Sequence, residues 1–180
     1  GAHFPQTLPP PGEAPSWIRP VHERFLDLAA VAGLRRITTH LGWMFGLTCP
    51  DRLGWVADEG RRGWLSRPEW YRAAAEVYGG LEKVLEDSVS VYRWLCREAA
   101  DRGITVAIET ACVELLSVNT RPDRLRLFIR EVGAPNLGVC LDAGHCHLQG
   151  VDPAEMVREL GDLILETHFH DNLGDADSHL

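Results

Sequence analysis

Lysine is scarce in this sequence: Lys83 is the only one, and 26 acidic residues against 18 lysines and arginines give a net charge of −8. An acidic chain without an evident strip rich in lysine and arginine argues against a nucleic-acid ligand. No apolar stretch reaches the roughly 20 residues that a membrane-spanning helix needs, and residues 1–16 lack the charged and apolar regions of a signal peptide. We therefore expect neither a membrane partner nor secretion.

Paired cysteines are also missing. The chain has five cysteines, and none of them form a Cys-x-x-Cys pair. An odd, scattered set of thiols is typical of a reduced protein, so we expect a cytoplasmic location. Cys140 lies inside an apolar run, and we interpret it as a small buried hydrophobe.

Apolar residues recur with helical and strand periods in alternation along the chain. The pattern predicts helices from a Ser16 cap to about Ala32, over 71–101, over 122–132, and from Asp152-Pro153 to about Leu160. It predicts strands over 34–40, 104–110, 137–142 and 163–170, whereas 41–69 is rich in Trp and Gly without a regular period. Such alternation is typical of one α/β domain whose parallel sheet is covered by helices.

Each expected strand ends in a polar side chain on its less bulky face, namely His40, Glu109, Asp142 or His168. The carboxyl ends of barrel strands are where α/β barrels build active sites. Imidazole and carboxylate groups on matching faces predict a divalent metal, since mixed N/O sites suit Mn²⁺, Mg²⁺, Co²⁺ or Zn²⁺. No cysteine is expected at these ends, so a structural zinc site is not predicted.

Other polar residues near the strand ends differ in what they suggest. Glu166 is expected to point into the interior of the barrel, where a carboxylate needs either a partner or a catalytic role. His22 is interpreted as a structural residue of a helix, and His147 and His170 are not assigned to the site.

The strings VAIET, LGVCLDAGHCHLQG and THFHDNLGDADSHL, in this order, resemble the xylose isomerase-like TIM-barrel superfamily. That superfamily includes sugar phosphate isomerases and epimerases, with the endonuclease IV type of AP endonuclease as a sister group. The resemblance implies a (β/α)₈ barrel with a divalent metal at its carboxyl mouth. It implies Glu109, Asp142 and His168 as metal ligands, Glu109 and His145 as catalytic residues, and His3, His40, Asp177 and His179 as additional candidates for metal or substrate contact. Independently of the resemblance, the long Trp-rich loop that includes Trp43 is interpreted as a substrate lid, with ordinary surface packing as the alternative.

The sequence departs from the family in two respects. A full barrel needs about 250 residues, so 180 residues predict an incomplete (β/α)₈ barrel. It would form a single domain over 1–180, truncated at both ends, that runs from the family's second strand to its sixth. The eighth-strand Glu, the family's last metal ligand, is then absent. Thr110 also stands where many relatives have Asn.

The resemblance implies a divalent-metal-dependent isomerase or epimerase that acts on a sugar, sugar phosphate or sugar acid by enediolate proton transfer. Two alternatives stay open. The histidines would suffice for an endonuclease IV-like zinc phosphodiesterase, and the missing eighth-strand Glu is compatible with a non-catalytic barrel relative. A small carbohydrate is the expected partner. The sequence leaves open the substrate, the metal, the activity of this segment alone and the oligomeric state, a homo-oligomer included.

Overall fold

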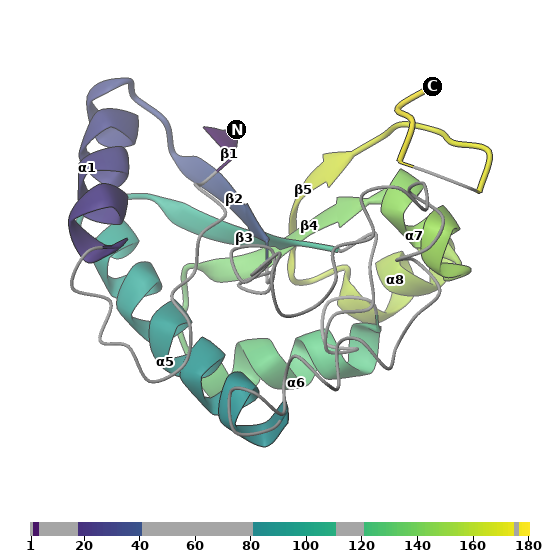
Figure 1. Ribbon diagram of the computed structural model, residues 1–180, viewed down its shortest axis with the longest axis horizontal. Coiled ribbons are helices and arrows are strands. Elements are labelled where there is room, and N and C mark those ends of the chain that lie inside the picture. The colour runs from purple at the N-terminus through teal and green to yellow at the C-terminus, as the bar shows by residue number, and fades with distance from the viewer. Residues whose placement is uncertain (1, 4–17, 41–80, 111–120, 175–176) are drawn as a thin grey trace, which may run out of the picture.

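A computed structural model describes residues 2–3, 18–40, 81–110, 121–174 and 177–180. Its strands form one parallel sheet in the order β1-β2-β3-β4-β5, with each strand beside its neighbour in the chain. In Figure 1, α1, α5, α6 and α8 form an arc along the outside of this sheet. The strands are β1 (Ala2–His3), β2 (Arg36–His40), β3 (Thr105–Glu109), β4 (Leu137–Asp142) and β5 (Ile164–His168), and the helices are α1 (Ile18–Val31), α5 (Leu81–Ala100), α6 (Pro122–Val132), α7 (Ala143–Gln149) and α8 (Pro153–Leu160).

This topology is that of a partial (β/α)₈ barrel, in which sequential parallel strands are joined through outer helices. It confirms the predicted fold class and the predicted alternation of strands and helices. Among the described helices, none is long and apolar enough to cross a membrane.

Local chemistry sets several of the helix ends. Gly33 follows α1 with φ of 74° and Gly133 follows α6 with φ of 69°, a left-handed conformation that glycine adopts without steric cost. Pro122 begins α6, where its missing N–H leaves no intrahelical bond unmade. The carboxylate of Asp152 accepts a hydrogen bond from the backbone N–H of Ala154 at 2.9 Å and caps α8. These signals were readable in the sequence.

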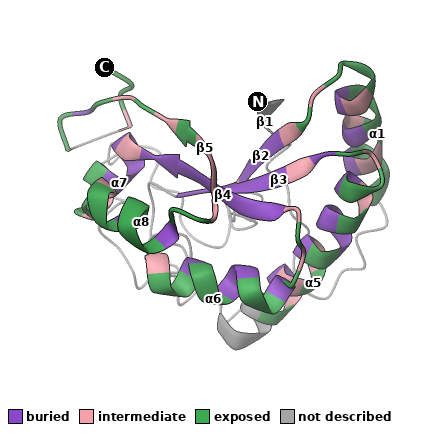
Figure 2. Cartoon of the chain, turned by 180° about the vertical axis from the view of Figure 1, so that it is seen from behind, coloured by how far each residue is buried: buried purple, intermediate pink, exposed green. Residues whose placement is uncertain are grey.

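The core lies between the outer face of the sheet and the helices. Figure 2 shows β2, β3 and β4 buried along most of their length, whereas the helices are buried mainly on one side. Burying this apolar surface is the main favourable term in the folding of such a layer. The cluster includes Ile37, Val106, Ile108, Val139 and Leu141 from strands and Leu26, Leu95, Leu125, Met156 and Leu160 from helices.

The other face of the sheet carries smaller and more polar residues. In the strand register, Thr38 lies beside Ala107 and Ala107 lies beside Gly138. Gly138 has no room for a side chain, because a Cβ there would lie 2.5 Å from the carbonyl oxygen of Leu163 and 2.6 Å from Cγ of Leu165. The missing Cβ therefore allows β5 to approach β4 closely.

Glu166 has a partner on this face. The hydroxyl of Thr38 donates a hydrogen bond to Oε2 of Glu166 at 3.0 Å, which links β2 to β5 across two intervening strands. The predicted need of an inward carboxylate for a partner is thus met by a neutral donor.

The structure differs from the expected elements in three places. The short helix α7 was not predicted, because seven residues are too few to show a helical period. The strand expected over 163–170 ends at His168, where its partner β4 also ends and turns into α7. The helix expected over 71–101 is described from Leu81 and ends at Ala100, and its first ten expected residues lie outside the described residues. Ser16, the expected cap of the first helix, also lies outside them.

We expect Gly138→Ala to lower the free energy of unfolding by about 1–3 kcal/mol, the range for overpacking a filled interior. Urea denaturation measures this change. Gly150→Asn is the control: Gly150 has φ of 64° with nothing within 4 Å of its would-be Cβ, and asparagine tolerates this conformation. Equal losses in both variants would show that crowding at Gly138 is not the cause.

Candidate metal centre

Four strands place polar side chains at the carboxyl edge of the sheet. The parallel register sets His40 of β2 beside Glu109 of β3, and Asp142 of β4 beside His168 of β5. Because all strands run the same way, their last residues gather at one edge. All four residues predicted at strand ends therefore lie in one region.

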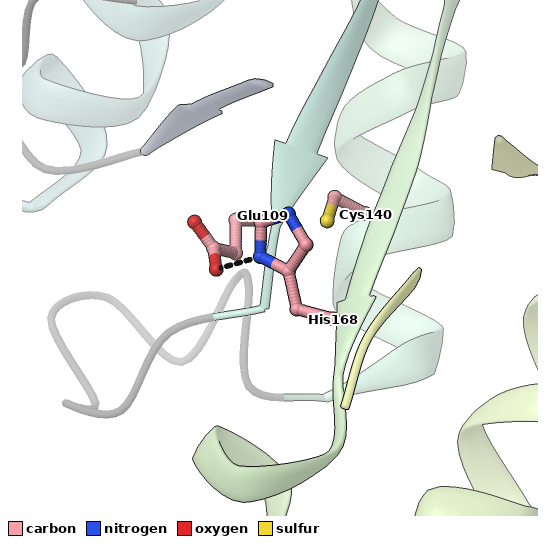
Figure 3. Close-up of side chains that lie close together, drawn as sticks. All are labelled: Glu109, Cys140 and His168. Carbon is pink, nitrogen blue, oxygen red and sulfur yellow. Dashed lines mark hydrogen bonds and ion pairs between the residues drawn. The ribbon is translucent and has the colours of Figure 1, made fainter. Parts of the chain in front are cut away.

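Glu109 is the centre of the inner group. Its Oε1 accepts a hydrogen bond from Nδ1 of His168 at 2.8 Å, and its Oε2 lies 3.0 Å from Nε2 of His40. The same nitrogen of His168 lies 3.6 Å from Oδ2 of Asp142. Figure 3 shows the Glu109 carboxylate and the His168 ring turned toward each other. The three residues predicted as metal ligands are thus brought together.

Burial and charge act in opposite directions on Glu109, which is 2% exposed. Burial by itself raises the pKa of this carboxyl, but contact with His40 and then with His168 and His145 outweighs it and lowers the pKa to about 2. Glu109 is therefore an ionised carboxylate inside the protein, and an ionised oxygen is the form that a metal ligand needs.

Cys140 lies next to this group, contrary to the expectation that no cysteine would be found there. Its sulfur and the candidate ligand atoms of Glu109 and His168 all lie within 4.8 Å of one another. Figure 3 shows the three side chains close together. Burial, and then the nearby carboxylates Glu109 and Glu166, raise the pKa of the Cys140 thiol well above its usual range. The thiol of Cys140 therefore lies beside the nitrogen and oxygen donors of the inner group and is protonated when no metal is bound.

Thr110, directly after β3, organises the adjoining strand end. Its hydroxyl accepts a hydrogen bond from the backbone N–H of Asp142 at 2.9 Å, and its carbonyl oxygen lies 2.7 Å from Nδ1 of His145. Since a carbonyl only accepts, Nδ1 of His145 carries the proton. Nε2, the other ring nitrogen of His145, lies 3.3 Å from Oδ2 of Asp177.

A second, outer group lies beside the first. Asp177 Oδ1 lies 3.3 Å from Nε2 of His179 and 3.6 Å from Nε2 of His170, and the rings of His170 and His179 stack with centroids 3.9 Å apart. His145, Asp177 and His179 had been predicted near the site. His170 had not, and it proves to be the link between the two groups, since its Nε2 also lies 2.9 Å from Oδ1 of Asp142. Its signal in the sequence was its position two residues after His168.

The remaining predicted residues are not part of the described site. Trp43 lies outside the described residues, and His3 is described only as a strand residue whose backbone pairs beside Thr38. His22 of α1 is fully buried and its ring stacks on that of Trp94 of α5, with centroids 5.9 Å apart. His147 is an exposed residue of α7.

The donor set fits a divalent metal. Two buried carboxylates, Glu109 and Asp142, face the imidazole of His168 from neighbouring strands. Buried charges that converge in this way are typical of groups that share a cation. The described residues contain three groups with ligand atoms within 4.8 Å of one another: Glu109, Cys140 and His168; Asp142, His145 and His170; and His170, Asp177 and His179.

Comparison with known proteins gives a family match over most of the chain. A family model described as "Xylose isomerase-like TIM barrel" matches residues 21–180. Among curated proteins, an uncharacterized protein of Methanocaldococcus jannaschii is 29% identical over 103 residues, which cover 56% of this chain and 35% of that protein. An uncharacterized protein of Sinorhizobium fredii is 35% identical over 80 residues, 44% of this chain and 25% of that protein. The chain thus spans about a third or less of these relatives.

Solved structures show the same fold at low identity. A D-tagatose 3-epimerase-like protein superposes with a TM-score of 0.65 at 20% identity, over 99% of this chain and 58% of that one. The 3-keto-D-glucoside 4-epimerase of E. coli superposes with a TM-score of 0.59 at 19% identity, over 83% of this chain and 49% of that one. The IolI protein, solved with a bound zinc atom, superposes with a TM-score of 0.60 at 16% identity, over 93% of this chain and 49% of that one. The structural neighbours are therefore sugar epimerase- and isomerase-like TIM barrels.

Thr110→Val should lower the free energy of unfolding by about 1–3 kcal/mol, because the buried N–H of Asp142 loses its acceptor. Thr110→Ser is the matched variant, since it keeps the hydroxyl and should retain most of the stability. Urea denaturation of the metal-free protein measures both. A valine variant as stable as the serine variant would contradict the role of this hydroxyl.

The pKa of Glu109 predicts a pH dependence of stability. Its folded value of about 2 lies below the reference value of 4.5, so the ionised group stabilises the fold above about pH 4.5 and loses that effect as the pH falls toward 2. We expect the difference in unfolding free energy between wild type and Glu109→Gln to shrink over this window. Urea titrations of the metal-free proteins at a series of pH values measure it, and a difference that does not change with pH would contradict the assignment.

Proposed function

The chain belongs to the xylose isomerase-like TIM-barrel family, and from this membership and the site we propose that it forms the metal-binding half of a sugar isomerase or epimerase. The proposed reaction is enediolate proton transfer on a sugar, sugar phosphate or sugar acid. The observation that carries the proposal is the pair of buried carboxylates, Glu109 and Asp142, on either side of Nδ1 of His168.

Glu109, Asp142 and His168 would hold the metal, with Mn²⁺, Mg²⁺, Co²⁺ or Zn²⁺ compatible with such donors. A bound divalent ion would supply Lewis acidity toward the adjacent carbonyl and hydroxyl oxygens of a ketose. The same residues lie at the carboxyl edge of the strands, where the barrel mouth admits a small molecule.

The protein groups would supply binding and proton transfer. The two oxygens of Glu109 face different histidines, so one can serve the metal while the other exchanges a proton with the substrate carbon. Nδ1 of His145 is fixed by the carbonyl oxygen of Thr110, and Nε2, which contacts Asp177 of the outer group, would polarise a substrate oxygen. A second acid or base for the opposite face of the carbon would come from outside the described residues.

A zinc phosphodiesterase remains a second candidate because of one observation. His145, Asp177 and His179 lie together beside the inner group, and a cluster of several metal ions could use them in addition. The scarcity of lysine and the net charge of −8 disfavour a phosphate-backbone substrate.

The location and partner follow from the same proposal. A small carbohydrate is the proposed partner. Cys96, Cys140 and Cys146 are free and buried, which supports the proposed cytoplasmic, reducing location.

Metal content of the full-length protein, measured by mass spectrometry, tests the proposal. We expect about one ion per chain, lost in Asp142→Ala and kept in His179→Ala, with His147→Ala as an unaffected control. Several zinc ions per chain, one of them lost in His179→Ala, would favour the phosphodiesterase. The absence of bound metal from wild type would overturn both.

The proposed proton transfer can be measured directly by isotope exchange. Ketoses incubated with the metal-loaded protein in deuterium oxide should exchange the proton next to the carbonyl, as seen by proton NMR. Glu109→Gln should slow this exchange about 100-fold or more, the typical contribution of a positioned acid or base. Exchange that persists unchanged in Glu109→Gln would assign the proton transfer to another group.

A further inference from the structure

We propose that His170 is a positioning residue that fixes which oxygen of Asp142 faces the metal. The inference rests on the proposed function in one respect, because it assumes that Asp142 is a ligand. It adds a role for a residue that neither the predicted site residues nor the inner donor set includes.

The two oxygens of Asp142 have different surroundings. Oδ1 accepts the backbone N–H of His145 at 2.8 Å and lies 2.9 Å from Nε2 of His170. Oδ2 faces the proposed ligand His168, whose Nδ1 is 3.6 Å away, and lies 3.9 Å from Nδ1 of His145. The protein thus occupies Oδ1 and leaves Oδ2 directed toward the inner group.

The His170 ring is held by contacts that leave it little freedom. It is 8% exposed and stacks on His179 with an interplanar angle of 9°. It also packs on Gly144 so closely that a Cβ there would lie 2.1 Å from its Cε1. The side-chain amide of Asn172 donates to the carbonyl oxygen of Gly144 at 2.8 Å, which holds the segment after β5 against α7.

These contacts fix the position of the His170 ring, and through it the orientation of the Asp142 carboxylate. An imidazole that contacts a ligating carboxylate orients it and lowers the cost of arranging the site, and loss of such a partner typically costs 10–100-fold in metal affinity. Gly144 is required because any side chain there would displace the ring from Asp142. His170 would then act through Asp142 without touching the metal.

The test measures Co²⁺ binding to the full-length protein by titration calorimetry, together with the visible spectrum of bound Co²⁺, which reports the number and geometry of its ligands. His170→Ala removes the ring. His170→Gln keeps an amide N–H at a reach similar to that of Nε2, but an amide is a poor metal ligand. His147→Ala, an exposed histidine of the same region, is the matched control, and circular dichroism checks that each variant is folded.

We expect His170→Ala to weaken Co²⁺ binding about 10–100-fold and to alter its spectrum, while His170→Gln and His147→Ala stay close to wild type. Gly144→Ala should weaken binding as His170→Ala does. In the His170→Ala background it should add nothing, because the ring that it displaces is gone.

Other results overturn the inference in distinct ways. Wild-type affinity in His170→Ala would show that the ring does not position Asp142. Loss of one bound ion per chain in both His170→Ala and His170→Gln would make His170 a ligand instead. If Gly144→Ala and His170→Ala lowered Co²⁺ affinity additively, Gly144 would not act through the His170 ring. If wild type itself binds no Co²⁺, the proposed function fails.

Discussion

The burial of two carboxylates at neighbouring strand ends is the constraint on which the site depends. Glu109 and Asp142 are 2% and 1% exposed, and an isolated buried carboxylate is strongly unfavourable. The surrounding residues reduce this cost through imidazoles, a backbone N–H and the hydroxyl of Thr110 that fixes the backbone of Asp142. The polar contacts at the strand ends thus make the carboxylates tolerable and also arrange them for a cation.

The outer face of the sheet stabilises the fold, whereas the inner face carries the small and polar residues of the candidate site. The outer face joins the apolar cluster with the helices, which supplies the favourable burial. The inner face carries small residues such as Ala107 and Gly138 in place of bulky apolar ones, and the hydrogen bond from Thr38 to Glu166. The absence of bulk there lets β5 approach β4, and this approach sets His168 beside Asp142.

The inner and outer groups form one continuous set of contacts. His145 is anchored to Thr110 through one ring nitrogen and faces Asp177 through the other. His170 contacts Asp142 on one side and stacks on His179 on the other. A change in the outer group therefore has a physical route to the inner carboxylates through these two imidazoles.

The α/β class, the order of strands and helices, and the strand-end positions of Glu109, Asp142 and His168 could be predicted from the amino-acid sequence. This was possible because strand and helix periods, Gly33 and Pro122 are local signals, and because parallel strands must end at one edge. Three contacts could not be predicted in this way: Cys140 lies near Glu109, Thr38 donates a hydrogen bond to Glu166, and His170 rather than His147 contacts Asp142. These contacts join residues from different elements, and their choice depends on close packing such as that of His170 on Gly144, which no local pattern encodes.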